Sequence, residues 1–139
     1  MALNISTYLE GKWLNMLKGA AFTAPTTYLG IVSDVAVDAD MEAGTLTDEI
    51  TGYTGNRPAV SFGAITPGGN KSTMPNSAAN IDYLLMPAPA GRQVKYAIVC
   101  DAATGGNILY WCPLSLMKVW NTGDTFRIPA TTGLTLDLG

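Results

Sequence analysis

Residues 93–112 read QVKYAIVCDAATGGNILYWC, and this stretch decides the fold. Two runs rich in apolar, β-branched and aromatic residues, Gln93–Cys100 and Asn107–Cys112, flank the small-residue segment Asp101–Gly106. Two such runs joined by a short glycine-containing loop are typical of a β-hairpin. The stretch therefore predicts two antiparallel strands as the centre of a β-rich body.

Shorter runs of the same kind lie on both sides of this hairpin and are separated by turns rich in Gly, Pro and Asn, such as Pro67–Asn70. Short strands with turn signals between them favour a sandwich or a barrel. We therefore predict one domain over residues 1–139, mainly β, an antiparallel β-sandwich or barrel with its β-rich body at 25–139. Residues 34–49 are expected to form a long acidic loop, and 70–80 a polar stretch. Further strands are expected at Thr27–Ser33, Ala59–Ile65, Ile81–Met86, Thr125–Ile128 and Leu134–Leu138.

The one clear helix signal lies in the N-terminal arm, residues 1–20. Thr7 and Glu10 have the spacing of a capping box, in which a hydroxyl and a carboxylate satisfy free amides at the helix start. Apolar residues then recur at helical spacing, and Gly19 is a natural terminator. The pattern predicts a helix over Tyr8–Lys18 whose apolar stripe is packed against other protein. The stripe consists of Leu9, Trp13, Met16 and Leu17.

The composition indicates a protein that binds other proteins. Of the 139 residues, 47% are apolar and 14% are charged, whereas ordinary soluble domains carry about 25% charged residues. Two explanations are open: a surface coated with uncharged polar residues, or a surface covered by other subunits, which we favour. The net charge is −3 and the eight basic residues are scattered, which argues against nucleic acid as a partner.

The chain carries no segment of 18 consecutive apolar residues and no secretory signal pattern at its N-terminus. We therefore expect no membrane partner and assembly in a cytoplasm. In such a compartment Cys100 and Cys112 are expected to be reduced and buried. The hairpin geometry supports this, because it sets Cys100 opposite Asn107 rather than opposite Cys112.

The chain has no histidine, which argues against catalysis. Ser-His-Asp and Cys-His arrangements and ordinary catalytic zinc sites all need that residue. A Ser–Lys dyad or a carboxylate pair is still open, but no pair of carboxylates is placed as a glycosidase requires. We expect no enzyme activity, no cofactor and no catalytic residue.

Six of the eleven acidic residues fall within 34–49. Asp38, Asp40 and Glu42 alternate in a way that could hold calcium, but the glycine and distal glutamate of an EF-hand loop are missing. A solvated acidic loop is the favoured interpretation. If the loop binds anything, a basic patch on a neighbouring subunit is as good a candidate as calcium.

The aromatic residues allow two interpretations. Tyr110, Trp111, Trp120 and Trp13 could form a sugar-binding platform, or they could lie in the core or in contacts between subunits. Tryptophan is used more often in cores and interfaces, so we favour the second interpretation.

Several segments in a fixed order give the chain a family resemblance. It resembles small bacteriophage virion proteins of the tail-fibre-like or head-decoration kind, which implies a structural and oligomeric role and carries over no catalytic residue. The longer acidic segment 34–49 and the polar stretch 70–80 depart from that pattern. The segments that carry the resemblance are Tyr8-Leu9, 14–17, 26–31, Gly52-Tyr53, 57–62, Asn76-Ser77, 101–111, 122–124 and 133–136.

The leading hypothesis is a capsid decoration or cement protein of the virion, which binds the major capsid protein and copies of itself, a trimer being favoured. The alternative is a tail-fibre or baseplate subunit that binds a host glycan through Trp111, Trp120 or Tyr110. A glycan-cleaving enzyme is a distant third. The candidate contact residues are Leu3, Ile5, Tyr8, Trp13, Asp38, Asp40, Glu42, Trp111 and Trp120.

Overall fold

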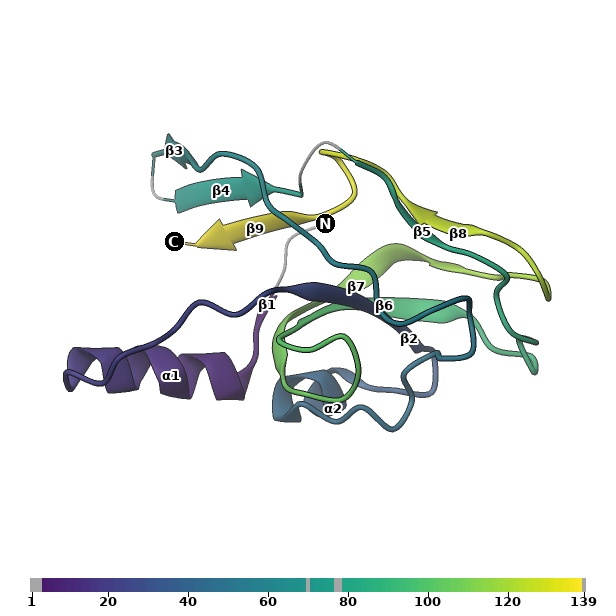
Figure 1. Ribbon diagram of the computed structural model, residues 1–139, viewed down its shortest axis with the longest axis horizontal. Coiled ribbons are helices and arrows are strands. Elements are labelled where there is room, and N and C mark those ends of the chain that lie inside the picture. The colour runs from purple at the N-terminus through teal and green to yellow at the C-terminus, as the bar shows by residue number, and fades with distance from the viewer. Residues whose placement is uncertain (1–3, 70, 77–78, 139) are drawn as a thin grey trace.

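The hairpin predicted from residues 93–112 is the centre of the fold. In the computed structural model, which describes residues 4–69, 71–76 and 79–138, its strands are β6 (Val94–Cys100) and β7 (Ile108–Lys118). The strands β2 (Tyr28–Ser33) and β1 (Asn4–Ile5) extend the sheet at its two edges. The resulting four-stranded sheet has the order β1-β7-β6-β2, and every pair in it is antiparallel (Figure 1).

The remaining strands form two smaller antiparallel sheets, one of three strands in the order β3-β4-β9 and one of two strands, β5-β8. The predicted N-terminal helix is present as α1, and a second helix, α2, follows β2. The expectation of a mainly β, antiparallel domain with an N-terminal helix is therefore confirmed. The bounds of these elements are α1 Thr7–Leu17, α2 Asp38–Ala43, β3 Thr66–Gly68, β4 Lys71–Pro75, β5 Ile81–Tyr83, β8 Phe126–Ile128 and β9 Thr135–Leu138.

The four-stranded sheet is covered on both faces. Ala97 and Val99 of β6 belong to the larger core, on the side of β5 and β8, whereas Ile98 and Cys100 belong to a smaller core under α2. Figure 1 shows β5 and β8 on one side of the four-stranded sheet and α2 on the other. A strand buried on both faces is apolar at successive positions instead of alternating, which explains the continuous run AIVC in β6.

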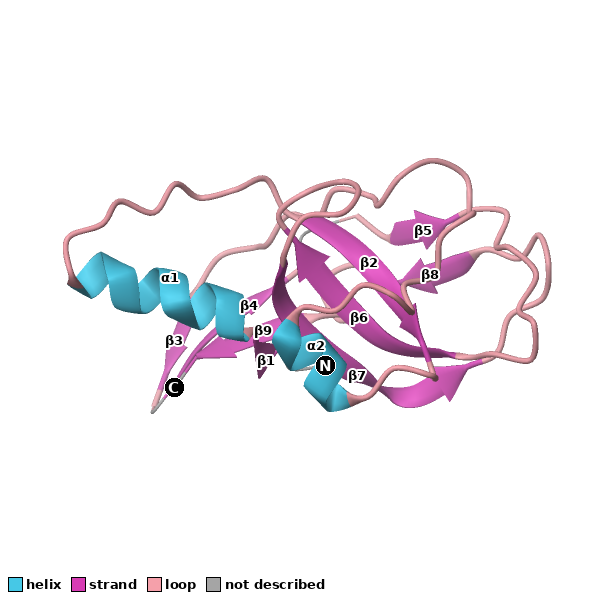
Figure 2. Ribbon diagram, turned by 90° about the horizontal axis from the view of Figure 1, so that it is seen from below, coloured by secondary structure: helices cyan, strands magenta, loops and turns pink. Residues whose placement is uncertain are grey.

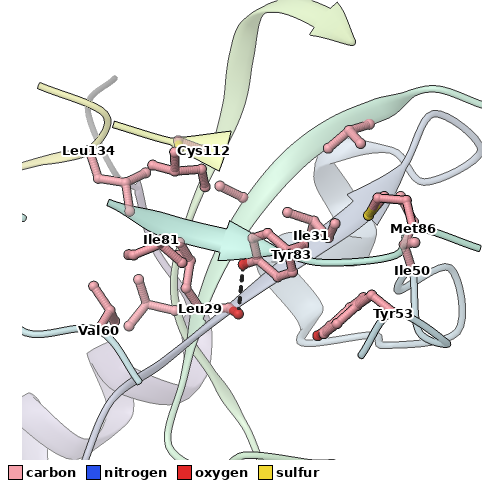
Figure 3. Close-up of a cluster of buried hydrophobic side chains, with 14 of the residues drawn as sticks. Leu29, Ile31, Ile50, Tyr53, Val60, Ile81, Tyr83, Met86, Cys112 and Leu134 are labelled. Atoms are coloured by element: carbon pink, nitrogen blue, oxygen red, sulfur yellow. Dashed lines mark hydrogen bonds between the residues drawn. The ribbon is translucent and has the colours of Figure 1, made fainter. Parts of the chain in front are cut away.

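Tyrosines fill much of the larger core (Figure 3). Tyr83 is fully buried, and its ring meets the ring of Tyr53 edge to face at 4.9 Å. Its hydroxyl donates a 2.8 Å hydrogen bond to the carbonyl of Leu29 in β2. Because the polar tip has a partner, the large ring can be buried without leaving a donor unsatisfied.

The start of α1 differs from the predicted capping box. Ser6, not Thr7, is the N-cap: its Oγ accepts a 3.3 Å hydrogen bond from the Leu9 amide and donates one to the Ile108 carbonyl of β7. The helix therefore begins one residue earlier than predicted. It ends at Leu17, and Gly19 has the positive φ of 87° typical of a terminating glycine.

The apolar stripe of α1 is packed only at its beginning, so the expectation of a fully packed stripe is wrong within the chain. Leu9 is 2% exposed and Trp13 is half-buried, but Met16 is 48% and Leu17 is 85% exposed. The reason is visible in Figure 2, where α1 starts beside the four-stranded sheet and projects past its edge.

The two ends of the stripe should therefore differ in stability measurements. Leu9→Ala is expected to lower the free energy of unfolding by about 2–5 kcal/mol, because Leu9 is buried. Trp13→Ala is expected to cost less than the about 3–5 kcal/mol of a fully buried tryptophan. Urea unfolding of both variants checks this, and a larger loss for Trp13→Ala than for Leu9→Ala would contradict it.

The acidic segment 34–49 is not only a loop, because it contains the short helix α2. Asp40 caps this helix by accepting a 2.9 Å hydrogen bond from the Val37 amide, and Gly44 ends it with a φ of 79°. Met41 anchors it, fully buried in the smaller core. One buried side chain in six residues is too little for a helical period to be seen in the sequence.

Two further expectations are corrected. Residues 59–65 form isolated bridges instead of a strand, because Ala59 pairs with Tyr28 of β2 whereas Phe62 pairs with Asn76 just after β4, so the segment crosses from one partner to another. The polar stretch 70–80 contains β4, which pairs with β3 and β9. Asn70 of the predicted turn lies outside the described residues.

Candidate functional site

The carboxylates of the α2 segment are tied to the chain's own groups. Asp38 accepts a 2.5 Å hydrogen bond from the hydroxyl of Tyr96 in β6, while Asp40 caps α2. Burial, and then the bond to Asp38, raise the pKa of Tyr96. Among the described residues, no three acidic, cysteine or histidine side chains converge as a metal site requires. The calcium interpretation gains no support from this geometry.

Glu42 connects three elements at the start of α1. One carboxylate oxygen accepts from the Thr7 hydroxyl and the other from Trp111 Nε1, each at 3.1 Å. Trp111 is 7% exposed and packs edge to face on Tyr96, with 6.0 Å between ring centroids. The structure thus brings Glu42 and Trp111 together, and their contacts fix the point from which α1 leaves the body.

Trp120 lies in the other core, where it is 4% exposed and donates a 2.6 Å hydrogen bond from Nε1 to the Pro87 carbonyl. Tyr110 is half-buried against the same core. A glycan platform needs exposed aromatic faces. The hypothesis that Trp111 or Trp120 forms such a platform is therefore wrong: both rings are used inside the chain.

The remaining candidates lie in the N-terminal arm. Ile5 is half-buried opposite Tyr110 in the β1–β7 pair, and Tyr8 is 36% exposed with the Lys12 ammonium 5.2 Å from its ring. Leu3 lies outside the described residues. The arm therefore contributes both to the sheet edge and to the exposed helix.

A buried ion pair holds two loops together beside the core. Arg57 is 4% exposed and contacts both carboxylate oxygens of Glu49 at 2.6 Å. It also donates to the carbonyls of Ala102 at 2.8 Å and Gly105 at 2.6 Å. A guanidinium with this many partners is a structural tie between the 49–57 segment and the hairpin loop, because little of its donor capacity is left for a ligand.

The cavity beside this pair has a volume of 310 Å³, and Glu49, Tyr53, Asn56 and Arg57 are among its lining residues. Burial, and secondarily the Glu49 carboxylate, raise the pKa of Tyr53 to about 12. A general acid or base works best with a pKa near the operating pH. This cavity therefore lacks the signature of an acid–base site.

Both cysteine thiols are buried and free, and the register sets Cys100 opposite Ile108 and Cys112 opposite Ala97. Cys100 is thus one residue away from its predicted partner Asn107, and the register shifts again between Val99 and Cys100. In the loop, the Asp101 carboxylate accepts from the Asn107 amide at 2.7 Å and from its side chain at 2.8 Å.

The thiols are expected to be unreactive in the folded protein. Burial raises the pKa of Cys100 to about 12 and that of Cys112 to about 11, from an ordinary 9.0, and only the thiolate is a good nucleophile. At about pH 8, iodoacetamide should label neither thiol in buffer and both in urea, as mass spectrometry would show. Rapid labelling of the folded protein would contradict the expected low reactivity.

The two thiols also make stability depend on pH. Because burial raises the pKa of both thiols in the folded state, their contribution to stability is complete below about pH 9 and is lost as the pH rises toward 12.

Comparison with known proteins decides the family. Residues 4–136 match the model of a family described as podophage GP4 fiber I protein gp80. The chain belongs to this fibre protein family. The resemblance to small bacteriophage virion proteins is thereby confirmed, and the chain is a bacteriophage virion structural protein. No curated protein matches the chain.

The gp80 family description names a fibre protein, so it supports the tail-fibre alternative better than the leading hypothesis of capsid decoration. No helix within the described part of this chain has the length and hydrophobicity to cross a membrane.

The surface that sequence reasoning missed in this fibre-family chain is a set of exposed apolar residues. They are Leu14, Met16 and Leu17 on α1, Val35 and Val37 before α2, Leu84 and Leu85 after β5, Leu116, Met117 and Val119 around the end of β7, and Ile65.

The signal for part of this surface was present in the sequence. The helical period predicts the apolar stripe of α1, but a period shows only that a face is apolar and not which molecule covers it. Val35 and Val37 flank the fully buried Ala36 in an apolar run, which gives no sign from the sequence that the two valines are exposed.

Proposed function

We propose that this chain is a subunit of a phage tail fibre, a non-enzymatic protein that acts by binding other protein copies in the virion. The observation that carries the proposal is the match to a fibre protein family over residues 4–136, nearly the whole chain. The arrangement of titratable groups agrees with it: the Arg57–Glu49 pair and the α2 carboxylates are occupied by partners within the chain.

The exposed surface supports a role in assembly. Leu17 is 85% exposed, and Val35 and Val37 are each 53% exposed. Large apolar side chains that are exposed together on one element can mark a contact with other proteins. We propose that these residues are covered by neighbouring subunits in the fibre, and that the complex is a homo-oligomer, because closed cyclic symmetry is the usual arrangement for identical chains. A trimer is the size that we propose for it.

Immunogold electron microscopy of purified particles tests the location. Antibodies raised against this chain are expected to label the fibres, and quantitative mass spectrometry should give few copies per particle. Label spread over the head, with hundreds of copies, would instead support capsid decoration and overturn the fibre proposal. Light scattering on the purified protein tests the oligomer, for which a mass three times the 14.6 kDa chain is expected.

A further inference from the structure

We infer that the free end of α1 in one copy docks on the segment between β2 and α2 of a second copy. The inference rests on the proposed assembly role and deepens it, because it names the two surfaces that meet. One is the projecting apolar stripe of α1, and the other is the exposed pair Val35 and Val37 with its acidic neighbours.

The apolar stripe of α1 runs along the whole helix, although the rest of the chain buries only its beginning. Leu9 and Met16 lie seven residues apart, which is two helical turns, and Trp13 and Leu17 lie beside them. The same face that packs on β7 at Leu9 thus continues into solvent, where Met16 and Leu17 are 48% and 85% exposed. A helix with an apolar face is usually stable through tertiary packing of that face, so a second protein surface is expected at its outer half.

The surface before α2 combines exposed apolar side chains with acidic neighbours. Val35 and Val37 are each 53% exposed and stand two residues apart. Asp34, Asp38 and Asp40 flank them in sequence and also accept hydrogen bonds within the chain. These three carboxylates outnumber the one cation that the described residues place at the segment, Lys95, which donates a 3.0 Å hydrogen bond to the Ala36 carbonyl. On the other surface, Lys12 lies in α1 and Lys18 directly follows its end at Leu17. Apolar residues framed by opposite charges give both affinity and orientation to a contact.

The two surfaces lie apart on one molecule, because α1 projects away from the connection between β2 and α2. Thr7 at the start of α1 contacts Glu42 near the end of α2, and Figure 2 shows the two helices roughly end to end, with α1 projecting away from the β2–α2 connection. One chain therefore cannot bring its own two surfaces together. A contact between two different surfaces is heterologous, and it closes into a ring or continues into a filament.

A second apolar surface, the groove between the end of β7 and β8, fits α1 less well. Its volume is 310 Å³ and its lining includes Leu114, Val119 and Phe126, but also Lys118 and Arg127. Arg127 is paired with Asp82, but Lys118 has the same sign as Lys12 in α1 and Lys18 just after it, and like charges oppose a contact. The groove serves as the comparison in the experiment.

Sedimentation velocity on four double variants tests the inference. The helix variant is Met16→Gln with Leu17→Gln, and the acceptor variant is Val35→Lys with Val37→Lys. Both are expected to weaken self-association by at least about tenfold, as loss of central contacts does. The groove variant, Leu116→Gln with Val119→Gln, and the charge control, Thr54→Lys with Asn56→Lys, should associate like the unaltered chain. All the substituted residues are exposed in the single chain, so each variant is expected to fold. Unfolding temperatures equal to that of the unaltered chain would confirm this.

The decisive measurement mixes the helix variant with the acceptor variant. Each retains the surface that the other has lost, so a heterodimer of twice 14.6 kDa is expected from two monomers. Three results would overturn the inference: a monomeric unaltered chain at every concentration, loss of association in the groove variant but not the acceptor variant, or no heterodimer in the mixture. Labelling of the fibres in particles is measured separately, so the fibre proposal can stand or fall independently of this contact.

Discussion

Arg57→Ala is expected to destabilise the protein by about 3–5 kcal/mol, because it would leave a buried carboxylate without its partner. The side chains of Arg57 and Glu49 are only 2% and 9% exposed, and Arg57 also satisfies two loop carbonyls. The midpoint of urea unfolding, monitored by tryptophan fluorescence, measures the loss. The unfolding midpoint of Arg57→Lys should lie between those of Arg57→Ala and the unaltered chain, because an ammonium keeps the charge but cannot reproduce the forked contact with both oxygens of Glu49.

A matched control is available on the surface. Arg127 makes the same forked contact with Asp82, at 2.6 and 2.8 Å, but its side chain is 56% exposed. Water and salt screen such a pair, so Arg127→Ala should leave the unfolding midpoint nearly unchanged. Equal losses for the two arginine variants would show that burial does not decide the strength of the Arg57 pair.

The parts of the fold that could be predicted are those determined by local pattern. The hairpin over 93–112 has two apolar strands and a glycine loop in one short stretch, and the N-terminal helix has a cap and a recurring stripe. The parts that were missed depend on distant partners. The strand β1 has two residues and exists through its pairing with β7, and α2 is held by Met41 in a core built mostly from other elements.

The candidate site shows the same limit. Choosing Asp38 and Glu42 as contact residues followed from an acidic run, but their partners Tyr96 and Trp111 lie 58 and 69 residues away along the chain. No local pattern encodes such pairs. Residue type also could not separate Trp111, which is buried, from an exposed aromatic, because tryptophan occurs in cores as well as at binding surfaces.

Trp120→Ala tests this distinction and should cost about 3–5 kcal/mol of stability, since the ring is 4% exposed in the larger core. Trp120→Phe keeps most of the apolar area but leaves the Pro87 carbonyl without its 2.6 Å hydrogen bond, a change expected to cost about 1–3 kcal/mol. Thermal unfolding of both variants gives the order Ala below Phe below the unaltered chain.

The neighbouring residue provides the control, because Val119 is 71% exposed and Val119→Ala removes little buried surface. Its unfolding temperature should match that of the unaltered chain, which would show that the loss at position 120 arises from the core and not from the end of β7. Since the ring of Trp120 is covered by the chain itself, Trp120→Ala should change any binding of host polysaccharide only in parallel with unfolding. If Trp120→Ala instead kept its stability and lost binding to a glycan array, the ring would have to be exposed to the ligand, and its assignment to the core would be wrong.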